Sequence, residues 1–283
     1  MDIFNIFLLH HLFMFLLFRK RMRYGILLLT ACQLCTPLAA ADEPAPFQKS
    51  GYVQLDIGYA DLTNHFQNWF DQSLRGYAQV TPNDGINWEV SHQSHFAEQG
   101  VLGALGYQRV FNDEWYGSIS ASTSSDGSFL PLYRTDANLY KKWLDRRNLV
   151  TGVGFTYSQS RLKNYDRIVS LDLLYYFDAP WILELGGKIA ESNPGSVASH
   201  RGFAALTYGQ HKHYYLTAKF DYGTEGWQAI GATQTISSFV SHEASLNLRT
   251  WISNDFGFSL TTNHYSNPNY SRTGVIAGIF VDF

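Results

Sequence analysis

Residues 170–191 read SLDLLYYFDAPWILELGGKIAE, and this stretch decides the fold. Apolar and aromatic side chains occupy every second position on either side of residues 178–180. Asp172, Glu184 and Lys188 lie at the positions between them. Because successive side chains of a strand point to opposite faces, and a triplet containing Asp and Pro favours a turn, the stretch predicts a β-hairpin with one apolar and one charged face.

The same alternation recurs along the chain in segments of about ten residues, each bounded by turn-forming residues. A soluble β-sandwich also alternates, but sandwiches rarely sustain the pattern over so many strands. Counting the segments predicts an all-β fold, an antiparallel transmembrane β-barrel of about fourteen strands, or of twelve if the first hairpin lies outside the wall. The expected strands are 50–60, 73–81, 86–95, 100–110, 115–123, 133–143, 148–158, 167–177, 181–190, 200–209, 213–223, 240–251, 256–266 and 272–283.

The end of the chain supports the same interpretation. Residues 274–283 read GVIAGIFVDF, an alternating strand that stops on Phe283. A last strand ending in an aromatic residue is typical of bacterial outer-membrane barrels, in which it pairs with the first strand and leaves no edge. We therefore expect the outer membrane as the location, its lipid as a partner, and recognition of Phe283 by the barrel-assembly machinery.

Residues 1–41 have the pattern of a targeting segment. Met22 opens a short basic and then apolar stretch that ends in small residues, which predicts a secretory signal and a true start at Met22. A membrane helix over Met1–Phe18 is the alternative. The barrel domain is then expected over residues 42–283.

The two cysteines of the chain, Cys32 and Cys35, both lie in this signal segment. Residues 29–32 also resemble a lipoprotein signal, in which the chain is cleaved before a lipidated cysteine, although cleavage there leaves the signal a very short apolar stretch. With cleavage near Ala40 or Ala41, the mature chain has no cysteine, which excludes disulfides, thiol nucleophiles and cysteine metal sites.

The composition is rich in aromatic residues, with 18 Tyr, 20 Phe and 7 Trp. A formal net charge of -3 gives no sign of a nucleic-acid partner. Short turns alternate with longer segments rich in Ser, Gly and Asn, the longest being Thr224–Ser237 with Trp227. Aromatic residues beside the short turns are expected to form an interfacial girdle on the periplasmic side, where both termini are expected too. They are Trp115, Tyr116, Trp143, Tyr176, Phe177, Trp181, Tyr214, Tyr215 and Trp251.

Two segments carry a family resemblance. FLPLYR at residues 129–134 and NPGSVASHRGF at residues 193–203 resemble the YaiO family of outer-membrane β-barrel proteins, and the similarity runs from about Gly51 to Phe283. The resemblance implies an outer-membrane barrel associated in some bacteria with surface-polysaccharide machinery. It implies no catalytic residues.

The charged face of the strands predicts a polar lumen, and a channel for a saccharide or exported glycan is the first hypothesis. Charges of both signs either line a hydrated pore or pair and fill it. Arg134 and Arg201 attract most interest, because arginine suits anionic glycan groups. The lumen candidates are Arg134, Asp136, Glu184, Lys188, Arg201, Lys219, Asp221 and Arg249.

Two other functions stay open. His264 and Ser266, like His92 and Ser94, share the lipid-facing side of a strand, and such a pair resembles the one that outer-membrane lipid hydrolases use. The pattern is weak and lacks an identifiable carboxylate, so we expect no enzyme. A scaffold or receptor that binds through its outer loops is the third hypothesis. No cofactor is indicated, and the sequence HKH at residues 211–213 is not expected to bind a metal.

Overall fold

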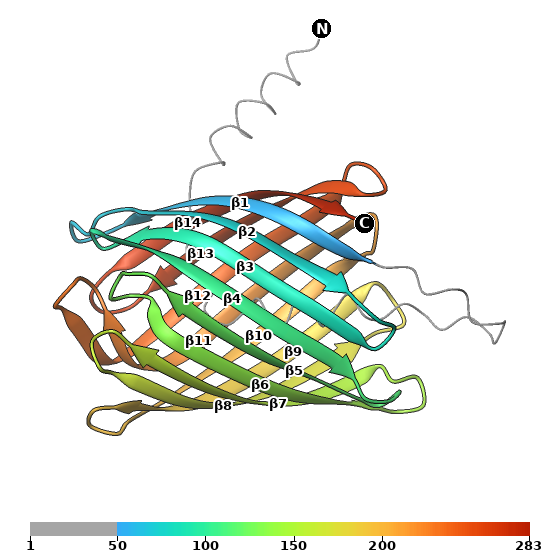
Figure 1. The fold of residues 1–283 in the computed structure, drawn as a ribbon, viewed down its shortest axis with the longest axis horizontal. Coiled ribbons are helices and arrows are strands. Elements are labelled where there is room, and N and C mark those ends of the chain that lie inside the picture. Colours follow the sequence, from blue (N-terminus) through green and yellow to red (C-terminus); the bar gives the residue numbers. More distant parts are fainter. Residues whose placement is uncertain (1–49) are drawn as a thin grey trace, which may run out of the picture.

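The computed structural model describes residues 50–283, in which fourteen antiparallel β-strands form one closed barrel (Figure 1). The predicted signal segment lies outside the described residues. Between residues 50 and 283 no helix is long and apolar enough to cross a membrane. The strands are β1 (Gly51–Leu62), β2 (Trp69–Gln79), β3 (Asp84–His95), β4 (Glu98–Val110), β5 (Trp115–Ser124), β6 (Pro131–Trp143), β7 (Leu149–Ser160), β8 (Tyr165–Tyr176), β9 (Trp181–Asn193), β10 (Val197–Gln210), β11 (Tyr214–Ala229), β12 (Thr235–Trp251), β13 (Phe256–Ser266) and β14 (Ser271–Asp282).

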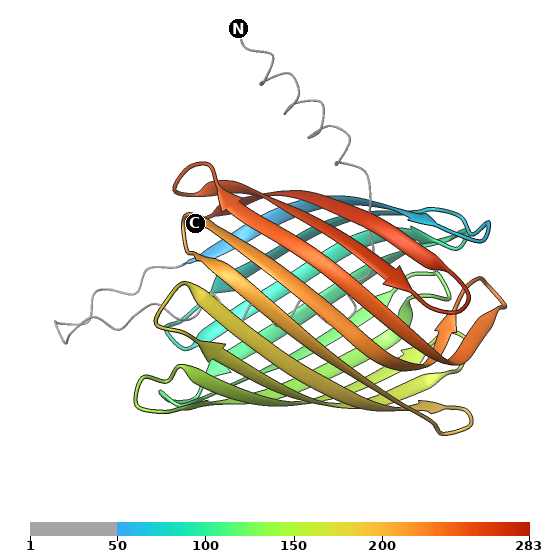
Figure 2. The same cartoon turned by 180° about the vertical axis from the view of Figure 1, so that it is seen from behind.

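The barrel closes between its first and last strands, as predicted. Strand β14 pairs with β1 in continuous antiparallel register from Tyr52 opposite Asp282 to Leu62 opposite Arg272. Two backbone hydrogen bonds extend the seam, from Gly51 N to Phe283 O at 2.8 Å and from Phe283 N to Gly51 O at 3.0 Å. Figure 2 shows β14, in red, beside β1, in blue. The first hairpin is therefore part of the wall, and the strand number is fourteen rather than twelve.

The two ends of the barrel differ. We call the end with Gly51 and Phe283 the terminal end and the opposite one the distal end. At the distal end the longest predicted loop, Thr224–Ser237, is mostly strand: β11 has 16 residues, β12 has 17, and only residues 230–234 join them. The loop prediction was wrong because it relied on Gly, Thr and Ser content, whereas ladder pairing continues as far as Ala229 opposite Thr235.

The side chains divide as the alternation predicts. Large apolar residues cover the outside of the wall, as with Leu171 at 64% and Ile189 at 70% exposure, and the inside carries polar residues such as the buried Asp56 and Asp71. A lipid environment explains apolar side chains outside and polar side chains inside, which would be unfavourable in water.

The predicted aromatic girdle is only half correct. Trp143, Phe177, Trp181 and Tyr214 are 40–45% exposed on the outside. By contrast, Tyr116 and Trp251 are buried, Tyr176 packs against the cluster of Tyr116 and Tyr140, and Tyr215 lines a cavity in the lumen. Adjacent residues of a strand cannot share a face, so the neighbouring pairs Tyr176 and Phe177, and Tyr214 and Tyr215, had to divide between the two faces.

Two glycines, the buried Gly257 and the outward-facing Gly103, test the packing inside the wall. A Cβ at Gly257 would lie 2.3 Å from Phe280 Cζ and 2.2 Å from Thr250 O, whereas a Cβ at Gly103 meets nothing within 4 Å. We predict that Gly257→Ala lowers the free energy of unfolding by about 1–3 kcal/mol, and that Gly103→Ala leaves it unchanged within about 0.5 kcal/mol. Urea titrations of the barrel refolded into lipid vesicles measure both, and equal effects would contradict the packing described.

Candidate functional site: a charge-paired chamber in the lumen

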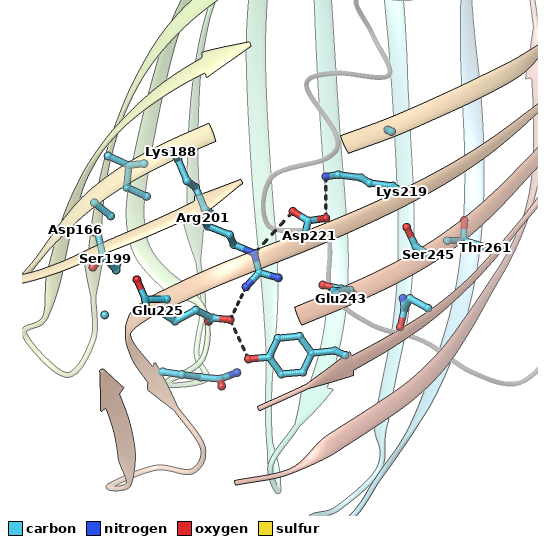
Figure 3. A pocket seen from close by; sticks show the side chains of 18 of the residues that line it. Asp166, Lys188, Ser199, Arg201, Lys219, Asp221, Glu225, Glu243, Ser245 and Thr261 are labelled. Atoms are coloured by element: carbon cyan, nitrogen blue, oxygen red, sulfur yellow. Dashed lines mark hydrogen bonds and ion pairs between the residues drawn. The ribbon is translucent and has the colours of Figure 1, made fainter. Parts of the chain in front are cut away.

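A cavity of about 270 Å³ lies inside the barrel, lined mainly by strands β8 to β13 (Figure 3). Six of the eight predicted lumen residues line it: Glu184, Lys188, Arg201, Lys219, Asp221 and Arg249. The remaining two, Arg134 and Asp136, are bound to each other and do not line it. The alternation along single strands therefore predicted residues on four different strands that line one cavity. We call this cavity the chamber.

A chain of ion pairs on β10 and β11, extended by a hydrogen bond to β13, crosses the chamber wall. Lys219 Nζ lies 3.4 Å from Oδ2 of Asp221, and Oδ1 of the same carboxylate lies 3.7 Å from Arg201 Nε. Arg201 Nη1 donates to Glu225 Oε1 at 3.2 Å, and the Tyr265 hydroxyl donates to the same oxygen at 2.9 Å. The drawn contacts in Figure 3 show that Arg201 joins two carboxylates on β11.

Two more arginines inside the barrel have carboxylate partners. Arg272 is fully buried, donates to Glu243 Oε1 at 2.8 Å, and lies 4.8 Å from the ring centres of Trp69 and Tyr265. Arg249 lies 3.5 Å from Asp282, and its guanidinium carbon is 3.4 Å from the ring centre of Phe280. The aromatic faces add cation–π attraction to these pairs.

Two carboxylates on the same wall differ from the others. Asp172 on β8 and Glu184 on β9 have no ion pair within 4 Å among residues 50–283, although Lys219 acts on both electrostatically. These two carboxyl groups are therefore not held by an ion pair, in contrast to Asp221 and Glu225.

The tips of several hairpins cover the distal mouth. Trp227 Nε1 donates to Asp166 at 3.0 Å, Gln228 Nε2 donates to the Tyr270 hydroxyl at 2.8 Å, and the Ser128 hydroxyl donates to Gly231 O at 2.9 Å. Ser128 belongs to the β5–β6 loop, and four strands separate β6 from β11 around the barrel. The last contact therefore spans the lumen. We call Trp227, Gln228 and Gly231 with their three partners the distal lid.

An aromatic cluster fills the lumen next to the lid, on the side of β1 to β3. Trp69 and Phe96 pack edge to face at 4.8 Å between ring centres. The His95 Nε2 to Asp71 Oδ1 pair, 2.8 Å long and fully buried, lies beneath them, and the His95 ring contacts Trp69 and Phe129. Sequence reasoning missed this pair, whose only signal is the alternation that places both side chains inside.

The proposed lipid-hydrolase pair is not assembled. His264 is exposed on the outside, as predicted, but its Nδ1 bonds to Thr273 Oγ1 at 2.9 Å. Ser266 Oγ bonds to Ser271 Oγ at 3.0 Å, and no hydrogen bond joins His264 to Ser266 in the described part of the chain. Within residues 50–283 no three His, Cys, Asp or Glu side chains are grouped to hold a metal ion.

The closed barrel, its apolar exterior and its charged interior define an integral β-barrel of the bacterial outer membrane. The family model described as the YaiO membrane beta barrel domain matches residues 50–228, so the chain belongs to this family. The predicted family and location are thereby confirmed. Among curated proteins, a sequence comparison finds no match.

Solved structures with a similar fold are outer-membrane barrels. The CymD monoaromatic hydrocarbon channel has a TM-score of 0.51 and 8% identity, over 83% of this chain and 87% of that one. An anion-selective porin from Comamonas acidovorans has a TM-score of 0.48 and 9% identity, over 83% and 99%. The KdgM porin, solved with disordered oligogalacturonate, has a TM-score of 0.43 and 10% identity, over 81% and 99%. At these identities the likeness describes the fold alone.

The Arg272–Glu243 pair gives a test of the paired interior. We predict that Arg272→Met costs about 3–5 kcal/mol of unfolding free energy because it leaves Glu243 buried without its partner. The double variant Arg272→Met/Glu243→Gln should recover most of this loss, whereas Arg146→Met, which removes a pair 73% and 80% exposed at a turn, should cost no more than about 1 kcal/mol. Urea titrations in vesicles give these values, and additive losses in the double variant would contradict the pairing.

Proposed function

We propose that this barrel is a gated channel of the outer membrane for a hydroxyl-rich solute such as a saccharide. The observation that supports the proposal is the chamber, a cavity of about 270 Å³ with charged walls that persists beneath the distal lid although most of its charges are paired. Barrels of about eight strands are filled by their own side chains, and those of sixteen to eighteen leave an open channel. Fourteen strands lie between these cases, where a lumen that is hollow but restricted is expected.

The lid favours a gate over a permanent plug because the hairpin that carries Trp227, Gln228 and Gly231 extends beyond the closed wall: pairing of β11 with β10 ends at Gly223, and pairing of β12 with β13 begins at His242. Its contacts to the rest of the barrel include the three side-chain hydrogen bonds of Trp227, Gln228 and Ser128. Each such bond contributes about 0.5–1.5 kcal/mol net. Between Gly223 and His242, β11 and β12 pair only with each other, so this hairpin can open as a unit without disturbing the ladders of the wall.

The gate predicts a change in conductance when the lid is weakened. Trp227→Phe combined with Gln228→Ala removes two of the lid hydrogen bonds and leaves the wall intact. We expect the open probability of single channels in planar bilayers to rise on the order of tenfold, the effect of losing about 1.4 kcal/mol.

The matched control is Thr233→Ala, at the exposed end of the same hairpin, which should behave like the unmodified protein. Refolding is checked by the heat-dependent shift of the band in electrophoresis. A folded barrel that stays electrically silent both with and without the lid substitutions would contradict the proposal.

A further inference from the structure

The wall of the chamber indicates which solutes it accepts. We infer that the chamber selects uncharged, hydroxyl-rich solutes and discriminates against anionic ones. This inference rests on the channel function proposed above and names its substrate class. It departs from the sequence-based hypothesis, in which Arg134 and Arg201 suited anionic glycan groups.

The first argument is that the cations of the chamber already have carboxylate partners. Arg201 contacts both Asp221 and Glu225, and Lys219 contacts Asp221. Outside the chamber, Arg134 donates through Nε to both oxygens of Asp136, at 3.1 and 2.9 Å. An anionic solute would have to displace one of these carboxylates and leave it without its partner inside the barrel, which is unfavourable.

Arg249 and Lys188 complete the set of cations that line the chamber. Arg249 is paired with Asp282, and Lys188 interacts electrostatically with Asp221 and Glu225. Each described cation of the wall therefore already interacts with a carboxylate, and an anion would have to compete with that carboxylate for it.

The second argument is the balance of charge. The residues that line the chamber include five acidic side chains, Asp166, Glu184, Asp221, Glu225 and Glu243, and four basic ones, Lys188, Arg201, Lys219 and Arg249. A lining with only one more acidic than basic side chain offers an anion no net attraction. Asp221, Glu225 and Glu243 already hold cations of the protein, so they bind a further cation only weakly.

The third argument is that hydroxyl groups fit the wall as it stands. A hydroxyl both donates and accepts, so it bonds to paired carboxylates, amides and other hydroxyls without breaking an ion pair. Ser199, Thr217, Ser245, Thr261 and Asn263 add neutral polar groups to the lining. Phe129, Trp227 and Tyr265 add aromatic rings, against which the apolar faces of a sugar ring pack.

Three sugars that share one ring and differ in charge test the inference: glucose, glucuronate and glucosamine, the last held below the pKa of its amine. Uptake of each radiolabelled sugar is measured into vesicles that contain the refolded barrel, with the membrane potential clamped at zero. We expect glucose to enter on the order of tenfold faster than glucuronate, a difference of about 1.4 kcal/mol. Glucosamine should enter at a rate within a few-fold of that of glucose.

A charge substitution makes the test specific to the chamber. Glu225→Gln removes one of the two carboxylates that hold Arg201, so the ratio of glucuronate to glucose uptake should rise about fivefold. The control is Glu191→Gln on the same barrel, because Glu191 bonds to Asn193 and Ser196 at the end of β9 and does not line the chamber. That substitution should leave the ratio unchanged.

The outcomes separate the inference from the function beneath it. If glucuronate enters as fast as glucose or faster, the inference is overturned but the proposed channel function is not. The same holds if glucosamine enters far faster than both. An unaltered ratio in Glu225→Gln, with the fold intact, would also overturn it. If no sugar enters, even with Trp227→Phe/Gln228→Ala, the channel function itself fails and the inference fails with it.

Discussion

The structure depends on one constraint, that a backbone surrounded by lipid must satisfy all of its own hydrogen bonds. A sheet meets this requirement only if it has no edges, so the pairing of β1 with β14 is required and not an additional stabilising contact. The seam runs from Leu62 opposite Arg272 to the bonds between Gly51 and Phe283. Residues 271–283 are therefore needed as a strand, because they complete this seam.

Closure also explains the interior. Once the ring is closed, every second side chain of every strand points into a shared lumen, and the charged residues there cannot leave it. Charges in such a space are stable when each finds an opposite partner, as Arg75 finds Asp56 at 3.0 Å and Arg272 finds Glu243. Pairing neutralises most of these charges without filling the lumen, so the chamber remains.

The sequence predicted those features that depend on period two alone. It predicted the fourteen strands, the exterior and interior faces, and the pairing of first and last strands, and six of its eight lumen candidates line the chamber. Some ion pairs also follow from this period, since Lys219 and Asp221 are two residues apart on one face. The distal lid was missed because residues 224–237 contain turn-forming residues, and only the register between β11 and β12 shows that they are strand.

Other features depend on contacts across the barrel, which no local pattern contains. Arg249 pairs with Asp282 across β13, and Ser128 reaches Gly231 across the lumen. The sequence left open whether the lumen charges pair or line a pore. In the structure most of them pair, and the pairs Arg201–Asp221 and Lys219–Asp221 lie along the wall of the chamber and not across it. This arrangement changes the chemistry expected of the arginines. Arg201 and its two carboxylate partners hold one another in place. The wall therefore presents oxygen and nitrogen atoms of fixed direction and carries little net charge. Such a wall suits a ligand that both donates and accepts hydrogen bonds.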